Sequence, residues 1–444
     1  MVKVIKGYYN NMTQIWQCEK QHDKSGAFWL FMIACFSMTQ IRIGAKIGIS
    51  EIFMVAAAPI LYFKNLRYYR QDGMMPILNL LFLWFLGALF ADWYNGADAF
   101  QFLRGFSVPV MIFSTAVCIH NFLRRDILNY KWIVFGLACS TVISTFIFQR
   151  GGAGDLAAEG NLAGAIDRVM SYKLFWVIMF QTWILLPIQV FYLKLPLGVS
   201  LAGVLAASFL AAMSGGRSAF LISLISMLLI LFAQRKIHSM AAIKRHILTI
   251  FIVLAMLGTS VRYGYKYAAT HGFLNEYETS KYERQTTNSD SVLGLLMSGR
   301  APFFIGLVAA LDRPIVGHGS WALDEKGYAA DFLNKYGSDL DRFLVAQAQK
   351  EMRMSIIPAH SHIVCYWLWH GIFGFLFWAY VIFLAIRTFA RYLHIIPEMF
   401  GYWAIGLPDF FWAVLFSPFG LRTGECAMFV SMVLLNKIAK GNRM

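Results

Sequence analysis

The sequence predicts an all-α integral membrane protein with about twelve transmembrane helices. Three observations lead to this prediction. Of the 444 residues, 58% are hydrophobic and 14% are charged, whereas a soluble domain carries about a quarter charged residues. Apolar runs long enough to cross a bilayer recur along most of the chain. The Lys and Arg residues gather in every second connection between these runs.

The candidate spans are apolar runs that approach the ~20 residues a helix needs to cross the hydrocarbon core. They cover 27–41, 49–64, 75–92, 99–120, 130–148, 170–191, 195–213, 218–234, 246–262, 362–386, 397–416 and 424–439. The first two are the shortest. A polar stretch, 17–25, precedes the first run and no small-residue cleavage site closes it, so we expect no cleavable signal peptide.

Basic residues give the predicted orientation. Near the N-terminus, in alternate connections and at the C-terminus stand Lys3, Lys6, Lys20, Lys24, Lys64, Arg67, Arg70, Arg124, Arg125, Lys131, Lys194, Arg235, Lys236, Lys244, Arg245, Arg387, Arg391, Lys437, Lys440 and Arg443. The intervening connections hold more acids, such as Asp92, Asp98, Asp155 and Glu159. The positive-inside rule therefore places both termini in the cytoplasm. Because the net charge of +15 follows this topology, it argues against nucleic acid as a partner.

One connection, 263–361, is far longer than the others and divides the chain into three parts. Nine spans occupy 1–262 and three occupy 362–444. We expect the loop to be extracytoplasmic and helical, with one helix over 292–311 and a more polar one over 331–354. A long loop with its own helices above a bundle suggests a lid or a substrate-binding cap.

Arg217 is a charged residue inside an otherwise apolar run, Met213-Ser-Gly-Gly-Arg-Ser-Ala-Phe220. A guanidinium keeps its charge, so at a membrane it must meet an interface, water or an anion. One interpretation is an anchor that reaches phosphate headgroups. The other is an anion site, which the small neighbours favour because they leave space beside the charge. Gly216 would also let the backbone approach a ligand.

Two further polar segments fall on the same predicted face of the membrane as Arg217. Ser298 could cap the loop helix and Arg300 opens it, beside backbone amides that lack intrahelical partners. An Arg beside a helix N-terminus favours an anion, although a solvated surface Arg is the alternative. His360 and His362 stand just before the tenth span and suit a general base or a hydrogen-bond donor. A histidine pair at the interface with no chemistry is the other interpretation.

The sequence predicts no cofactor and no metal. The six cysteines have no metal-ligand spacing and lie almost all in or beside apolar spans, so we expect them to be free. The two histidines lack a third ligand at fitting spacing, although His318 and His370 exist. No phosphate-binding glycine motif, nucleophile elbow or zinc signature is present, so the substrate must arrive already activated.

Together these segments resemble the bacterial O-antigen ligase and O-antigen polymerase superfamily. Ser214-Gly-Gly-Arg-Ser-Ala-Phe220 is similar to its arginine motif, and Ser298-Gly-Arg300 with Asp312-Arg-Pro-Ile-Val-Gly-His-Gly-Ser320 to its second block. Pro358-Ala-His-Ser-His362 and Trp369-His-Gly-Ile-Phe-Gly374 resemble the segment in which relatives carry a histidine, an apolar run and a glycine pair. The resemblance covers about residues 200 to 390 and rests on the order and spacing of short motifs.

The resemblance implies a metal-independent, inverting glycosyltransferase with a GT-C-like fold. Arg217 and Arg300 would bind the diphosphate of a glycan donor linked to undecaprenyl diphosphate. His360 would position or deprotonate the acceptor hydroxyl. The remaining expected substrate-binding residues are Gly216, Ser298, His318 and His362. His370 departs from the family pattern, since some relatives carry an acid there. The double histidine leaves open which ring acts, and the distance to Gly371 favours His360.

Three functions remain open at this point. The mixed charge of 331–354 favours a polymerase that lengthens O-antigen or exopolysaccharide on a lipid-linked acceptor. A ligase that transfers the glycan to lipid A–core is the alternative, and a transporter or flippase of the same lipid-linked glycan is the third. The expected location is the bacterial inner membrane, with the active site facing the periplasm. Polysaccharide export proteins would be further partners.

Overall fold

The computed structural model describes residues 24–37, 39–43, 45–146, 300–336, 356–392, 397–417 and 422–441. It also describes short stretches and single positions between 198 and 282, chiefly 222–229 and 266–273. These parts are mostly helical. The elements are α2 Lys24–Cys35, β1 Gln40–Ile43, β2 Ala45–Gly48, α3 Ile49–Asp72, α4 Met75–Tyr94, α5 Ala99–Leu123, η1 Ile127–Asn129, α6 Tyr130–Phe146, α14 Ala301–Asp312, α15 Tyr328–Tyr336, α17 His362–Tyr392, α18 Pro397–Phe416 and α19 Arg422–Gly441.

Four described helices are long and apolar enough to cross a membrane: α3, α4, α5 and residues 362–389 of α17. By their length and composition, these helices support the class of integral membrane protein. The total of about twelve spans stays a prediction. The helices α2, α6, α18 and α19, at four further expected spans, are not among these four, and most residues of the four expected spans between 170 and 262 lie outside the described residues.

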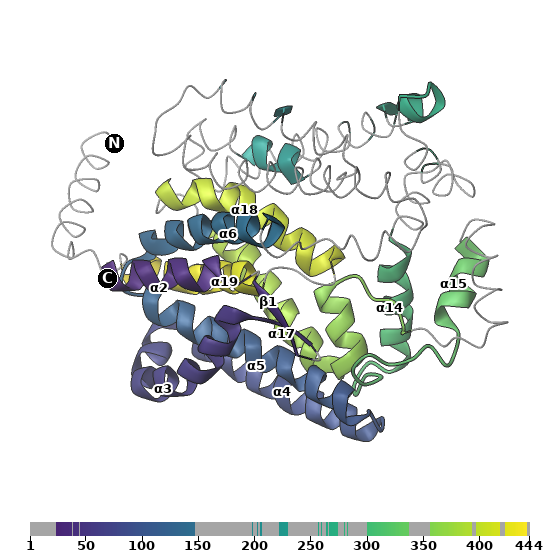
Figure 1. The fold of residues 1–444 in the computed structure, drawn as a ribbon, viewed down its shortest axis with the longest axis horizontal. Coiled ribbons are helices and arrows are strands. Elements are labelled where there is room, and N and C mark those ends of the chain that lie inside the picture. Colours follow the sequence, from purple (N-terminus) through teal and green to yellow (C-terminus); the bar gives the residue numbers. More distant parts are fainter. Residues whose placement is uncertain are drawn as a thin grey trace.

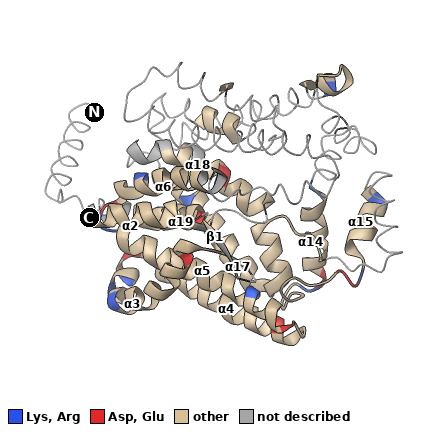
Figure 2. Ribbon diagram, viewed as in Figure 1, with Lys and Arg blue, Asp and Glu red and all other residues tan. Residues whose placement is uncertain are grey.

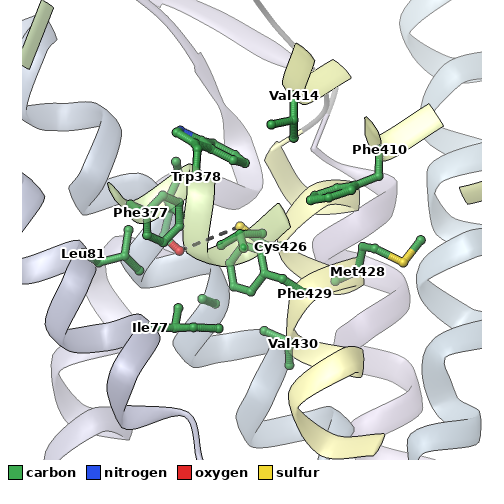
Figure 3. Close-up of a cluster of buried hydrophobic side chains, with 14 of the residues drawn as sticks. Ile77, Leu81, Phe377, Trp378, Phe410, Val414, Cys426, Met428, Phe429 and Val430 are labelled. Carbon is green, nitrogen blue, oxygen red and sulfur yellow. Dashed lines mark hydrogen bonds between the residues drawn. The ribbon is translucent and has the colours of Figure 1, made fainter. Parts of the chain in front are cut away.

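The long helices form one bundle with a shared apolar core (Figure 1). Within it, α17 packs on α4, α3 packs on α5, α2 packs on α6, and α19 packs on both α5 and α17. Figure 3 shows side chains of α4, α17, α18 and α19 that meet in this core, all of them buried: Ile77, Leu81, Phe377, Trp378, Phe410, Val414, Met428, Phe429 and Val430. The thiol of Cys426 lies among them and donates to the carbonyl of Ile112 at 3.8 Å.

A small β-hairpin replaces the end of the first expected span. The helix over 27–41 was expected to continue, but α2 ends at Cys35, and β1 and β2 pair antiparallel with Ile41 opposite Ile47. The alternation of apolar and polar residues in Gln40-Ile-Arg-Ile43 has the period of two that suits a strand. The described residues are consistent with the predicted all-α class, and the expected first span is wrong in its last residues, up to 41.

Most described spans begin where the sequence predicts, and α3, α4, α5 and α17 then extend further at the C-terminal end. The helix α3 continues from residue 64 to Asp72, and Gly73 ends it in the left-handed conformation at φ 79°. The loop helix α14 ends at Asp312 as expected, and Arg300 is the residue that precedes its first turn. The helix α15 begins at Tyr328, three residues before the expected start, and residues 337–355 lie outside the described part.

The two ends of the bundle differ in charge. At the left of Figure 1 lie the turn between α3 and α4 and the C-terminal end of α19, while α14 and α15 lie at the right. Figure 2 shows basic residues on α3 at the left and acidic residues beyond the right end of α4. The expected cytoplasmic residues Arg124 and Lys437 both contact Asp72 and so share one end. The side of the membrane that each end faces stays a prediction.

Candidate functional site

Arg300 lies where α14 meets the end of α18. Its guanidinium donates to the carbonyl oxygen of Phe416 at 3.2 Å and lies 4.5 Å from the ring centroid of Trp412. Burial lowers the pKa of Arg300 from its ordinary value. Even so, a guanidinium keeps its proton, so Arg300 is a half-buried positive charge held against an aromatic ring.

His360 lies within electrostatic range of Arg300. The helix α14 packs closely on the segment before α17, because a Cβ atom on Gly306 would come within 2.8 Å of the Ala359 side chain. The imidazole of His360 is exposed, yet partial burial by neighbouring atoms lowers its pKa and the positive charge of Arg300 lowers it further. The ring is therefore neutral near pH 7, with a nitrogen that can accept a proton.

The start of α17 fixes the two histidines differently. The hydroxyl of Ser361 donates to the carbonyl of Val414 at 3.0 Å and accepts from the amide of Val364 at 3.2 Å, so it caps the helix. His362 is buried, and its Nε2 atom is 3.1 Å from a carboxylate oxygen of Glu425. Since His362 lies away from solvent and His360 is exposed, this arrangement favours His360 as the histidine that meets a substrate.

Helix α17 is interrupted at Gly371, and the loop before Ser320 fills the interruption. Gly371 has φ 67° and ψ −150°, a conformation that glycine alone adopts readily. The amides of His318 and Gly319 donate to the carbonyls of Leu368 and Trp369 at 2.7 and 3.1 Å. In return, the amide of Ile372 donates to the carbonyl of Ile315 at 3.0 Å.

This exchange satisfies backbone groups that a broken helix would otherwise leave unpaired in an apolar surrounding. Gly317 makes the close approach possible, because a Cβ atom there would come within 2.7 Å of the Trp369 carbonyl oxygen. The structure thus brings together two of the sequence blocks on which the family resemblance rests, 312–320 and 369–374.

A buried polar chain links α4, this loop and α17. The indole of Trp84 donates to Nδ1 of His370 at 2.8 Å, so the neutral ring carries its proton on Nε2. Nε2 then donates to the hydroxyl of Ser320 at 2.9 Å, and that hydroxyl donates to Asp92 at 2.8 Å. The amide of Ser320 also donates to Asp92, at 2.5 Å.

The serine, histidine and aspartate are not arranged as a nucleophilic triad. A triad needs a histidine that accepts the serine proton and an aspartate that holds the histidine. Here the histidine donates to Ser320, and the aspartate accepts from Ser320. All three side chains are buried. Gly105 of α5 leaves the space they occupy, because a Cβ atom there would collide with Ser320 and Asp92.

The structure does not bring His318 to the site of Arg300 and His360. Nε2 of His318 is 2.8 Å from the carbonyl oxygen of Ala309, in the last turn of α14. Arg300 precedes the first turn of this helix, and the nine residues from Arg300 to Ala309 span about 14 Å of helix. The expected substrate-binding role of His318 has no support from this position, since its ring completes the hydrogen bonding of a helix end.

Three expected site residues, Gly216, Arg217 and Ser298, lie outside the described residues. Within the described part of the chain, no three His, Cys, Asp or Glu side chains are grouped as metal ligands. Comparison with protein families, with curated proteins and with solved structures finds no match to this chain.

Sequence reasoning missed the buried chain through Asp92, Ser320, His370 and Trp84. Asp92 was counted as a loop acid, but it lies buried in the last turn of α4. A carboxylate that follows directly on an apolar run was a usable signal, because such a group needs a partner inside the protein. Its partner is 228 residues away in sequence, which no local pattern could indicate.

Proposed function

We propose that this protein is a lipid-linked glycan transferase of the bacterial inner membrane. In its active site, Arg300 would bind the donor diphosphate and His360 would act on the acceptor. The observation that carries the proposal is the position of these two residues. A half-buried arginine without a described carboxylate partner lies beside an exposed, neutral histidine at the less basic end of an apolar bundle. This pair suits an anionic donor together with an acceptor that carries a hydroxyl group.

The chemistry needs no metal and no nucleotide. The acceptor oxygen forms a bond to the anomeric carbon while the bond from that carbon to the phosphate oxygen breaks. The acceptor proton passes to the neutral ring of His360, and the diphosphate leaves with the electron pair. Arg300 would stabilise the charge that grows on the leaving group, and Arg217 would do the same if it joins the site. Attack opposite the leaving group inverts the anomeric centre.

For the acceptor, a second lipid-linked glycan is favoured over lipid A–core. A ligase must receive a strongly phosphorylated acceptor, which suits a surface rich in basic residues. The sequence that begins in α15 mixes both signs, with Asp331 and Lys335 within the described part. A polysaccharide polymerase is therefore the first candidate and an O-antigen ligase the second.

One observation keeps a transporter or flippase as a third candidate, because broken helices are common in transporters. The helix α17 is interrupted at Gly371. However, the carbonyls of Leu368 and Trp369 that the break frees accept hydrogen bonds from the loop, so they are already used. This occupied break favours a fixed scaffold over a coupling-ion site.

Purified protein in detergent, mixed with lipid-linked glycan extracted from the native host, tests the proposal. A transferase yields a longer or transferred glycan, and His360→Ala abolishes that product. Glycan gels of a deletion strain then separate the acceptors. Single repeat units on lipid A, or loss of secreted polymer, indicate a polymerase, whereas long chains retained on the carrier lipid indicate a ligase. If no product forms in detergent and the protein translocates lipid in liposomes, the proposed transferase activity is overturned.

A further inference from the structure

Arg104 is a second arginine held against aromatic rings at the same end of the bundle as Arg300. It lies in the second turn of α5, and its guanidinium is 4.0 Å from the ring centroid of Trp321 and 5.2 Å from that of Phe100. The side chain is half-buried. An arginine inside an apolar helix is expected to face protein, water or an anion.

The positive charge of Arg104 is not neutralised by the described part of the protein. A guanidinium has five N–H donors, and no described residue forms an ion pair with Arg104 or accepts a hydrogen bond from its side chain.

Several acids at this end are engaged by other groups. Asp92 accepts from Ser320, and Asp98 caps α5 by accepting from two backbone amides. Asp312 accepts from Lys326 and Tyr328, two hydrogen bonds that lower its pKa to about 2. Asp324 caps α15 through the amides of Tyr328 and Ala329.

The ring that holds Arg104 is itself rigidly placed. Trp321 stacks on Trp369 with 4.3 Å between ring centroids, and Arg104 lies 4.0 Å from the centroid of the same indole. The backbone of Trp321 has φ 55°, which is unfavourable for a residue with a side chain. Strain of this kind persists only where the surroundings impose it, and it often accompanies binding sites.

Backbone hydrogen bonds place the residues that follow Trp321 beside the segment that carries His360. The carbonyl of Ala322 accepts from the amide of Ile357 at 3.0 Å, and Leu323 pairs with Ile356 in an isolated β-bridge. His360 follows Ile357 by three residues, a distance of at most about 10 Å in extended chain. Arg104 and its ring thus flank the segment that carries His360.

We propose that Arg104, held over the ring of Trp321, is a phosphate-binding residue that takes a phosphate group of the lipid-linked substrate. This inference rests on the proposed function for the identity of the substrate. None of the described residues accepts a hydrogen bond from the Arg104 side chain, so its N–H donors are available, and a guanidinium fork suits bidentate binding of phosphate oxygens. A phospholipid headgroup offers the same chemistry, so the test must distinguish the two sources.

Site-resolved arginine labelling of the full-length protein in phosphatidylcholine nanodiscs is the direct test. Phenylglyoxal modification is followed residue by residue by mass spectrometry, with inorganic pyrophosphate as the probe. We expect pyrophosphate to slow the labelling of Arg104 several-fold and to leave Arg70 unaffected, since Arg70 is exposed at the opposite end. Equal labelling of Arg104 with and without pyrophosphate would overturn the inference.

A second arm identifies the source of the phosphate. Phosphatidylglycerol replaces phosphatidylcholine in the nanodisc, without pyrophosphate. Protection of Arg104 by pyrophosphate alone assigns the residue to the substrate, as proposed. Protection by the anionic lipid alone assigns it to the membrane and overturns the substrate role.

Variants give an independent readout of affinity. Arg104→Gln should weaken pyrophosphate binding about tenfold, the loss expected for one charged hydrogen-bonding group. Arg70→Gln is the matched control, and it should bind as the wild type does. Because labelling and binding need no turnover, a wild-type protein that protects Arg104 but forms no glycan product would refute the proposed function alone.

Discussion

Two buried aspartates, one at each end of the helical bundle, are stabilised in opposite ways. Asp72 lies at the end of α3, and its carboxylate contacts His120 at 3.1 Å, Arg124 at 3.2 Å and Lys437 at 2.6 Å. Asp92 lies at the end of α4 and receives hydrogen bonds from the amide and hydroxyl of Ser320. One end therefore pairs its carboxylate with cations, and the other satisfies it with neutral donors.

The difference decides which cations remain for a ligand. At the Asp72 end, the contacts join α3, α5 and α19, so the basic side chains stabilise the protein itself. At the Asp92 end, Arg104 and Arg300 lie on aromatic rings and have no carboxylate partner among the described residues. A cation without an internal partner is available to an external anion. This contrast is the physical basis for placing an anionic substrate at the Asp92 end.

The largest expected effect is on transfer activity. Arg300→Ala and His360→Ala should each lower the rate by about 10²–10³, the usual loss when a group that stabilises developing charge is removed. Arg70→Ala, at the other end, should leave the rate unchanged. The measurement is product formation with equal amounts of folded protein in each sample. Full activity in Arg300→Ala would contradict the placement of the anionic substrate at the Asp92 end.

The second effect concerns two glycines with positive φ, one near each end. Gly371→Ala should prevent correct packing of α17, because its Cβ atom would meet the carbonyl of Ile315 and because its backbone conformation suits glycine alone. Gly73→Ala should cost only about 1 kcal/mol, since open space surrounds Gly73 and only the backbone strain remains. Unfolding in detergent measures the stability of both variants. Equal losses of stability in Gly371→Ala and Gly73→Ala would contradict the packing described for the loop before Ser320.

The third effect is on stability and compares the aspartates directly. Asp72→Asn should lower the free energy of unfolding by about 2 kcal/mol, because it leaves cations without their carboxylate, a loss that solvent moderates at the half-exposed Lys437. Asp92→Asn should cost about 1 kcal/mol, because only neutral hydrogen bonds are rearranged. A larger loss for Asp92→Asn than for Asp72→Asn would show that the two ends are not stabilised as described.

The smallest effect is a shift in the titration of His360. Its pKa lies below the ordinary value, so activity should fall only when the pH drops through that lowered pKa and the ring becomes charged. Arg300→Gln removes a positive charge, so the pKa of His360 should rise. NMR of histidine labelled at Cε1, assigned with His360→Asn, measures the shift. An unchanged pKa would mean that the two side chains do not interact.

The helices could be predicted from the sequence because apolar runs and their ends are local features. The expected spans from 75, 99 and 397 begin where α4, α5 and α18 begin. The hairpin at 40–48 was not predicted, since the alternation in 40–43 covers only four residues and directly follows an apolar run that fits a helix. The break at Gly371 was not predicted either, because its cause is a loop that precedes it by some fifty residues and bonds to the freed carbonyls.

The candidate site was predictable only in part. Arg300 and His360 could be selected because charged and titratable residues beside apolar runs need partners. The burial of His362 against Glu425 depends on the packing of α17 on α19, and the sequence alone could not separate the two histidines. Arg104 was not selected, although a charged residue inside the expected span 99–120 was a usable signal; its aromatic partner Trp321 is distant in sequence.

Binding of undecaprenyl diphosphate to the purified protein in phosphatidylcholine nanodiscs tests the central claim most directly. Wild type, Arg300→Gln and Arg70→Gln are compared without acceptor, so that only binding is measured. The account predicts that Arg300→Gln weakens the affinity at least about tenfold, as expected for a lost charge-assisted hydrogen bond, and that Arg70→Gln binds as the wild type does. Equal affinities in all three proteins would contradict it.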